Sequence, residues 1–280
     1  MSKIDELGVR MKGYEGVASG RLLPKTPVII RVDGKAFHTF TKKLNKPFDE
    51  LLIDSMHQTL LYLCRNIGGC VLGYTQSDEI SLLLQDYKSI ETQPYFDYRI
   101  EKLCSIVASM ATFAFNRAFQ NYATDFYNAC SDSQSLFEEN KERIKALLHC
   151  CDIGALFDAR AFNVPFSEVT NYFYWREKDA IRNAIEMVGH ANFSANELNK
   201  VNCEGIKKKL LEEKGIDIDT FPTYLMRGVC CHKVGVPAFS LDGKPIMRTT
   251  WEICVDIPVF VKEGRSYIED KIGERFDLLR

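Results

Sequence analysis

The stretch PVIIRVDG, residues 27–34, decides the fold of this chain. Four β-branched residues lie between Pro27 and the Asp33-Gly34 pair. An apolar run of this length, bounded by Pro on one side and Asp-Gly on the other, predicts a buried strand followed by a turn. We therefore expect a core strand that carries Asp33 at its C-terminal end.

A helix and a hairpin are predicted directly after this strand. Apolar residues recur at helical spacing over residues 47–66, and the acidic residues near the start of that stretch favour the positive end of a helix dipole. Two short apolar runs, 70–74 and 80–84, then flank a polar segment that contains Asp78 and Glu79. Two such runs around a polar turn predict a β-hairpin.

The remaining chain alternates between helical and strand patterns, without a repeat, a low-complexity tract or a clear linker. Its periodicity predicts helices at 5–17, 98–126, 134–149, 167–188 and 203–214, and strands at 156–162, 228–234 and 246–259. This order predicts an α+β fold in which helices pack on one face of an antiparallel or mixed sheet, close to the split βαβ pattern.

Composition restricts the class of protein. The 280 residues include 36 Lys and Arg against 38 Asp and Glu, so the net charge of −2 excludes a wholly basic surface but allows a local nucleic-acid patch. No apolar run approaches the ~20 residues of a membrane span, and acids near the N-terminus differ from a signal peptide. We expect a soluble, cytoplasmic protein without a membrane partner, whose ten cysteines are reduced core thiols.

Two carboxylate positions are candidates for a metal site. Asp33 ends the first strand, and Asp78 lies with Glu79 in the hairpin turn. The order strand, helix, hairpin can bring both aspartates to adjacent strand ends, where they repel each other unless a cation lies between them. Such oxygen ligands suit Mg²⁺, and two ions about 3.5–4 Å apart can serve phosphoryl transfer. From the residues alone, two ordinary polar turns remain an alternative.

Several basic residues support two interpretations. Arg99 and Lys102 share one helix face and are either triphosphate ligands or a solvated edge of that helix. The run Lys207, Lys208 and Lys209 is either a solvated helix face or a contact for a phosphate backbone.

Five motifs, taken together in their order and spacing, resemble the tRNA(His) guanylyltransferase family over roughly residues 5–235. They are RVDGKAFH at 31–38, KPFD at 46–49, YTQSDE at 74–79, FDAR at 157–160 and YWR at 174–176. The resemblance implies a polymerase-palm-like core that adds nucleotides to the 5′ end of RNA, in the 3′-to-5′ direction. It also implies a palm-like catalytic part at 1–135, which holds the nucleotide and metal site. The C-terminal part, 136–280, would complete one compact unit and supply tRNA and oligomer contacts.

The resemblance also assigns site residues by position. It implies Asp33, Asp78 and Glu79 as catalytic residues, with Glu79 a supporting acid, and two Mg²⁺ ions held by Asp33, Asp78 and the carbonyl of Gly34. The nucleotide-binding matches are Asp33, Gly34, Lys35, Ala36, Phe37 and His38, which wrap the triphosphate, together with Lys46, Asp49, Ser77, Asp78, Arg99 and Lys102. RNA contacts are expected at Arg160, Arg176, Arg182, Asn183, Lys207, Lys208 and Lys209.

The implied reaction has two nucleotidyl transfers. The RNA 5′-phosphate first attacks ATP or GTP and releases pyrophosphate, and the 3′-hydroxyl of an incoming nucleoside triphosphate then attacks the activated end. The family also implies a homotetramer. One departure is that Ile181 occupies the histidine position of the His-Ile-Asn-Asn stretch of the eukaryotic enzymes. This departure favours the guanylyltransferase-like branch that repairs truncated tRNA 5′ ends by template pairing.

Two other functions remain open. A palm-type nucleotide cyclase would use the same pair of metal carboxylates but would need no RNA. A catalytically vestigial RNA-binding protein would need no metal site, although Asp33, Gly34 and Asp78 are intact in this chain.

Overall fold

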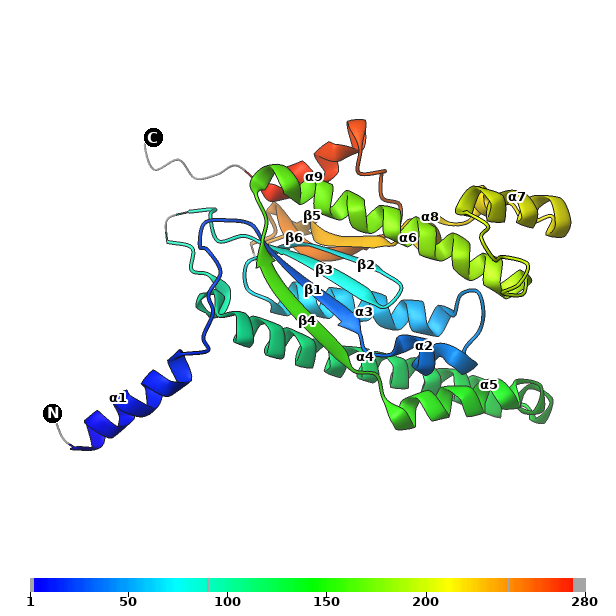
Figure 1. The fold of residues 1–280 in the computed structure, drawn as a ribbon, viewed down its shortest axis with the longest axis horizontal. Coiled ribbons are helices and arrows are strands. Elements are labelled where there is room, and N and C mark those ends of the chain that lie inside the picture. The colour runs from blue at the N-terminus through cyan, green and yellow to red at the C-terminus, as the bar shows by residue number, and fades with distance from the viewer. Residues whose placement is uncertain (1–2, 90, 241, 274–280) are drawn as a thin grey trace.

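A six-stranded sheet forms the centre of the computed structural model, which describes residues 3–89, 91–240 and 242–273. Neighbouring strands are all antiparallel, in the spatial order β4-β1-β3-β2-β5-β6 (Figure 1). The strands are β1 (Val28–Gly34), β2 (Cys70–Gln76), β3 (Glu79–Leu84), β4 (Phe157–Asn163), β5 (Val229–Phe239) and β6 (Pro245–Cys254). The α+β class is confirmed, and of the two predicted sheet types, antiparallel or mixed, the structure has the antiparallel one.

The longer helices lie close to their predicted positions, whereas three short ones, at residues 37–40, 223–227 and 265–272, were not predicted. The helices are α1 (Lys3–Gly16), α2 (Phe37–Phe40), α3 (Glu50–Asn66), α4 (Ile100–Ser131), α5 (Gln134–Ile153), α6 (Val169–Asn192), α7 (Cys203–Lys214), α8 (Thr223–Arg227) and α9 (Arg265–Ile272). Within the described ranges, none of these helices is long and apolar enough to cross a membrane. All ten cysteines are free thiols.

Helices cover both faces of the sheet, so the prediction of helices on one face is wrong. Val28, Ile30 and Val32 of β1 pack with α3 and α4 on one side, whereas Ile29 packs with α6 and α9 on the other. Figure 1 shows α3 and α4 below the strands and α6 and α9 above them. A strand that is apolar at successive positions buries both faces, and the sheet therefore needs a cover on each side.

The start of α3 differs in detail from the prediction. Asp49 is the residue that caps the helix, because its carboxylate accepts a hydrogen bond from the Leu52 N–H, and Pro47 lies before the first turn instead of within it. A capping carboxylate satisfies one of the N–H groups that have no partner inside the helix.

A buried ion pair joins the second layer of helices to the sheet. Glu177 of α6 is fully buried, and it accepts hydrogen bonds from Arg227 Nη1 and from the Phe260 N–H, both at 3.0 Å. The Tyr74 hydroxyl of β2 donates to the Arg227 carbonyl at 2.6 Å. Next to it, Gly228 has φ of +76°, and a Cβ there would lie 2.3 Å from the Thr75 carbonyl oxygen. These contacts fix α8 against β2, where the two elements form one end of a pocket.

Candidate active site

The end of β1 meets the β2–β3 turn at one end of the sheet. The Gly34 N–H donates to the Asp78 carbonyl at 3.1 Å, and Asp33 lies directly opposite Glu79 in the β1–β3 ladder. The turn is tight, with Ser77 at φ of 50° and its hydroxyl donating to Asp78 Oδ1 at 3.1 Å. The structure thus brings Asp33, Gly34, Ser77, Asp78 and Glu79 together.

The electrostatics of this cluster favour a bound cation. Burial raises the pKa of the Asp78 carboxyl, and the charge of Asp33 raises it further, against hydrogen bonds from Ser77 and from its own backbone N–H. A carboxyl group whose ionisation is disfavoured by burial and by a second carboxylate is an arrangement that a divalent ion relieves.

The donors available here fit Mg²⁺ bound together with a triphosphate. Within the described residues, no group of three or more His, Cys, Asp or Glu side chains could hold a metal ion. The oxygen donors that the fold brings to this end of the sheet include the carboxylates of Asp33 and Asp78 and the backbone carbonyl of Gly34, and a divalent ion there would need further ligands. Water and phosphate oxygens would supply the rest, which is the usual way Mg²⁺ is bound.

The residue after Asp33 is glycine for a steric reason. A Cβ on Gly34 would lie 2.2 Å from the ring of Phe37. That ring is buried in an aromatic cluster with Phe40, Phe115 and Phe157. The small residue therefore lets the chain turn back over the end of β1 and enter α2.

The loop from Asp33 to His38 has backbone donors left for a ligand. The Gly34 N–H is bonded to Asp78 and the Lys35 N–H to the Leu156 carbonyl at 2.8 Å. Ala36 is left-handed, with φ of 55°, and begins α2. In the described part of the chain, the N–H groups of residues 36–38 have no backbone acceptor.

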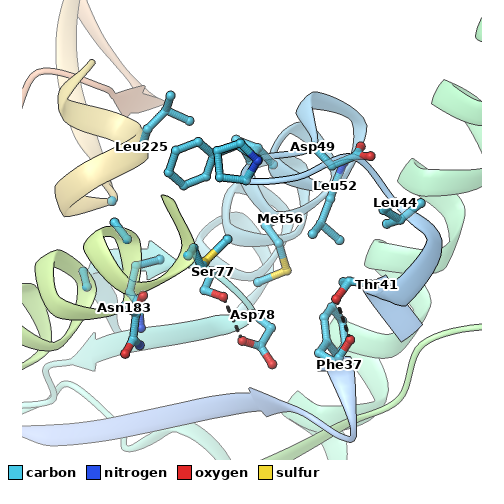
Figure 2. Close-up of a pocket in the computed structure, with 18 of the residues that line it drawn as sticks. Phe37, Thr41, Leu44, Asp49, Leu52, Met56, Ser77, Asp78, Asn183 and Leu225 are labelled. Carbon is cyan, nitrogen blue, oxygen red and sulfur yellow. Dashed lines mark hydrogen bonds between the residues drawn. The ribbon is translucent and has the colours of Figure 1, made fainter. Parts of the chain in front are cut away.

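A pocket of about 440 Å³ opens beside Ser77 and Asp78. Its walls come from α2 and the following loop, from α3, and from α6 and α8. Figure 2 shows Leu52 and Met56 inside it, with Asn183 and Leu225 opposite the side that carries Phe37 and Thr41. Its size and its largely apolar wall with a few polar groups are typical of a small-molecule site.

Four predicted nucleotide residues of this loop region, including Phe37, line the pocket. His38 and Lys46 are exposed at its rim. Asp49 is buried and ion-paired through both carboxylate oxygens to Arg143 of α5, with Nη2 to Oδ1 at 2.8 Å. Burial opposes ionisation of Asp49, but hydrogen bonds from Arg143 and two backbone N–H groups outweigh it and lower the pKa. Asp49 therefore shapes the pocket wall while its carboxylate is already engaged.

Glu79 and Arg176 form a buried ion pair next to Asp78. Their Oε1 and Nε atoms are 2.8 Å apart, and the exposed fraction is 8% for Glu79 and 5% for Arg176. The prediction of Arg176 as an RNA contact is therefore wrong, because an enclosed guanidinium cannot reach a phosphate backbone.

Arg99 and Lys102 lie at the other end of the sheet. Arg99 immediately precedes α4 and Lys102 lies in its first turn. This helix follows the end of β3 at Leu84, and Leu84 pairs with Val28 at the start of β1. A strand of this length separates the two ends by roughly 17 Å. Arg99 pairs with Glu101, and neither basic residue lines the pocket. A single copy of the chain therefore does not bring them to Asp33 and Asp78.

The other predicted RNA contacts divide into two groups. Asn183 lines the pocket, so it faces the same space as Ser77 and Asp78. The basic residues are exposed or partly exposed, and each lies near an acid: Arg160 by Asp158, Arg182 by Asp179, Lys207 by Asp219, Lys208 by Glu212 and Lys209 by Glu213. Surface pairs of this kind are weak and can exchange for a phosphate.

Sequence reasoning missed the far wall of the pocket. His57 of α3 and Tyr224 of α8 contribute to it, with ring centroids 6.3 Å apart. Burial lowers the pKa of His57 and thereby favours a neutral ring, although the nearby charge of Asp54 acts in the opposite direction. The spacing of Ile53 and His57 places them on one helix face and was the available signal, whereas nothing in the sequence connects Tyr224 to that face.

Known proteins resemble this chain in sequence and fold. The family model described as tRNAHis guanylyltransferase matches residues 8–165. The tRNA(His) guanylyltransferase of Schizosaccharomyces pombe is 30% identical over 231 residues, which cover 78% of this chain and 77% of that protein. The range matched by the family model, residues 8–165, contains β1, the hairpin and α3, but it ends before α6 and α8.

Two solved structures show the same arrangement of elements. A bacterial tRNA(His) guanylyltransferase-like protein in complex with ATP is 35% identical, with a TM-score of 0.76. A complex of a bacterial protein of this kind with GTP is 32% identical, with a TM-score of 0.74. Each comparison covers 95% of this chain and 99% of the other chain.

Proposed function

Because this chain belongs to the tRNA(His) guanylyltransferase family, a family of nucleotidyltransferases, we propose that it adds nucleotides to the 5′ end of tRNA in the 3′-to-5′ direction. One observation supports this most strongly. The Gly34 N–H to Asp78 hydrogen bond sets the end of β1 against the β2–β3 turn, so that Asp33 and Asp78 lie at neighbouring strand ends and Asp78 lines a pocket of about 440 Å³.

Asp33, Asp78 and the Gly34 carbonyl are the groups that would hold two Mg²⁺ ions. When bound there, the ions would lower the pKa of an attacking hydroxyl and neutralise charge on the leaving oxygens. The fit rests on the donor set, which consists of hard oxygens, and on the charge of Asp33, which raises the pKa of Asp78.

The loop before α2 would bind the triphosphate. Its backbone N–H groups at residues 36–38 have no backbone acceptor and are available to an anion, since donors at the start of a helix bind phosphate oxygens. The Ser77 hydroxyl and the exposed Lys46 lie at the same pocket. The base of ATP or GTP would then enter between Leu52 and Met56 of α3 and the wall formed by α6 and α8.

These residues would serve two successive reactions. In the first, the 5′-phosphate oxygen of the RNA attacks the α-phosphorus of ATP or GTP, and pyrophosphate leaves. In the second, the 3′-hydroxyl of the incoming nucleotide attacks the activated 5′ phosphorus, and the nucleoside monophosphate leaves. The protein supplies no nucleophile, so its role is to bind, align and neutralise charge.

We further propose a homotetramer in which Arg99 and Lys102 contact the nucleotide of a neighbouring copy. In one chain these residues begin α4 at the opposite end of the sheet from Asp33, yet both side chains are accessible. In this scheme residues 1–135 provide the metal and triphosphate groups, and 136–280 provide the far pocket wall and tRNA contacts at Arg160, Arg182 and the three lysines of α7.

The tRNA 5′-end repair branch is the one we propose, because Ile181 replaces the histidine of the eukaryotic motif. The test is extension of tRNAs that lack one 5′ nucleotide, with each nucleoside triphosphate in turn. We expect addition only of the base that pairs with the opposing 3′ strand. Addition of G regardless of that base would identify the tRNA(His) branch instead.

Two further outcomes would overturn the proposal itself. Cyclic nucleotide made from ATP without RNA would identify a cyclase. Tight tRNA binding without any Mg²⁺-dependent 5′ addition would identify a vestigial RNA-binding protein. The cytoplasm is the compartment we propose, since ten free thiols suit a reducing environment.

A further inference from the structure

A row of charged side chains lies on the α6 face of the sheet, beneath the site. Residues 29, 31 and 33 of β1 share this face, since side chains alternate along a strand and Ile29 packs with Val169 and Phe173 of α6. Arg176 follows Val169 and Phe173 on the same face of the helix. It is therefore positioned above the charged end of β1.

Acids from three strands lie side by side in this row. In the ladders, Asp33 of β1 is directly opposite Glu79 of β3 and Asp158 of β4. Asp158 is exposed, and solvent can screen its charge. Glu79 is nine-tenths buried and adjacent in sequence to Asp78, so its charge needs a partner within the protein.

The ion-pair partner of Glu79 is Arg176, and Arg31 of β1 is a second positive charge that acts on Glu79. The Arg176 side chain is fixed on several sides. Its Nε atom lies 2.8 Å from Glu79 Oε1, its Nη2 atom donates to Asp179, and its guanidinium lies 4.2 Å from the ring centroid of Trp175. The contact with Glu79 is an ion pair outside hydrogen-bonding geometry, since both atoms lack a hydrogen-bond partner among the described residues. Charge rather than directional bonding thus holds Glu79 in place.

We propose that Arg176 is a positioning residue for the two metal aspartates. By neutralising Glu79 and holding it under α6, it fixes the first residue of β3 and thereby the turn that carries Asp78. It also offsets the negative charge of Glu79 next to the two aspartates. This inference rests on the proposed function, because it assigns Arg176 a role in the same site.

The expected signature is tighter metal binding with slower chemistry. In Arg176→Gln, Glu79 loses its ion-pair partner and becomes free to approach the ions. Mn²⁺ alone, titrated and followed by electron paramagnetic resonance, should bind about threefold to tenfold more tightly, since one nearby positive charge is removed. The rate constant kcat for 5′ addition should fall about 10–100-fold, as for other groups that orient metal ligands, with the KM for ATP little changed.

Two variants and one control sharpen this test. Arg176→Lys keeps the charge and should restore most of kcat. The double variant E79Q/R176Q removes both charges and should be faster than R176Q alone, because no free carboxylate then competes for the ions. Arg265→Gln, in an exposed pair with Glu269 on α9, controls for loss of an arginine elsewhere.

Each alternative result has a distinct meaning. If R176Q lowers Mn²⁺ affinity together with the thermal midpoint, Arg176 only holds the fold together and the inference is wrong. Unchanged binding and unchanged kcat would also overturn it. Failure of the proposed function looks different: the unsubstituted protein would then bind no Mn²⁺ that Asp33→Asn abolishes, or would not extend any tRNA.

Discussion

In the folded chain, the charge of Asp33 disfavours ionisation of Asp78. Replacing Asp78 should therefore lower the catalytic rate without lowering stability. Asp78→Asn removes a metal ligand that the proposed chemistry needs and should lower the rate of 5′ addition about 10³-fold, because metal ions contribute several kcal/mol to such reactions. Its thermal midpoint should stay equal or rise, since the charge of Asp33 no longer disfavours ionisation nearby. A large drop in both quantities would show that Asp78 is needed for folding.

Asn183 is a polar side chain in a largely apolar wall of the pocket. Its amide makes no hydrogen bond within the part of the chain that the structure describes. An amide donates and accepts, so it can bind the edge of a base. Asn183→Ala should therefore lower kcat/KM about tenfold for one of ATP and GTP and by less for the other. Asn171→Ala, on the same helix but outside the pocket, is the matched control.

The pattern of losses identifies the group that Asn183 contacts. Equal losses for ATP and GTP would indicate a sugar or phosphate contact instead of a base. A raised KM for tRNA with unchanged use of ATP would support the RNA contact that the sequence predicts. No change in either substrate would remove Asn183 from the site.

The start of α3 depends on one buried carboxylate that caps the helix and joins it to α5. Arg143 and two backbone N–H groups lower the pKa of Asp49 below its usual 3.8 despite burial. The resulting stability is present at neutral pH and is lost as pH falls below about 3.8, through the lower folded-state pKa. Asp49→Asn keeps a capping oxygen but no charge, so its free energy of unfolding should fall less steeply with acidification than that of the parent chain.

Replacing Arg143, the other member of the ion pair with Asp49, tests the same contact from α5. Arg143→Met leaves the Asp49 carboxylate buried without its counter-charge and should destabilise the protein by about 3 kcal/mol or more, measured by urea unfolding at pH 7. If Arg143→Met costs no more than a typical surface change, the ion pair does not hold α3 and α5 together.

Elements were predictable from sequence where one contiguous pattern determines them. The apolar run before Asp33 and the two runs around Asp78 gave the correct strands, because burial leaves a local period. The packing of helices on the second face of the sheet was not predicted, since the apolar pattern of a strand does not show which elements pack on each side of it. Arg176 was misassigned because an arginine in a helix is normally exposed, and its partner Glu79 comes from a distant strand that only the fold brings near.

The position of Arg99 and Lys102 leads to a prediction about the assembled protein. If these residues act on the nucleotide of a neighbouring copy, a chain with Asp78→Asn and a chain with R99A/K102A carry defects in different halves of a shared site. Each assembly alone should be nearly inactive. Mixed assemblies, co-expressed and separated by two affinity tags, should recover a measurable part of the 5′-addition rate, because some sites combine an intact Asp78 with an intact Arg99 and Lys102.

A mixture of Asp33→Asn and Asp78→Asn chains is the matched control and should recover nothing, since both aspartates belong to the same chain's site. Full activity of R99A/K102A alone would place the two basic residues outside the reaction. Absence of recovery in assemblies that light scattering shows to be mixed would mean that one chain must supply every group itself.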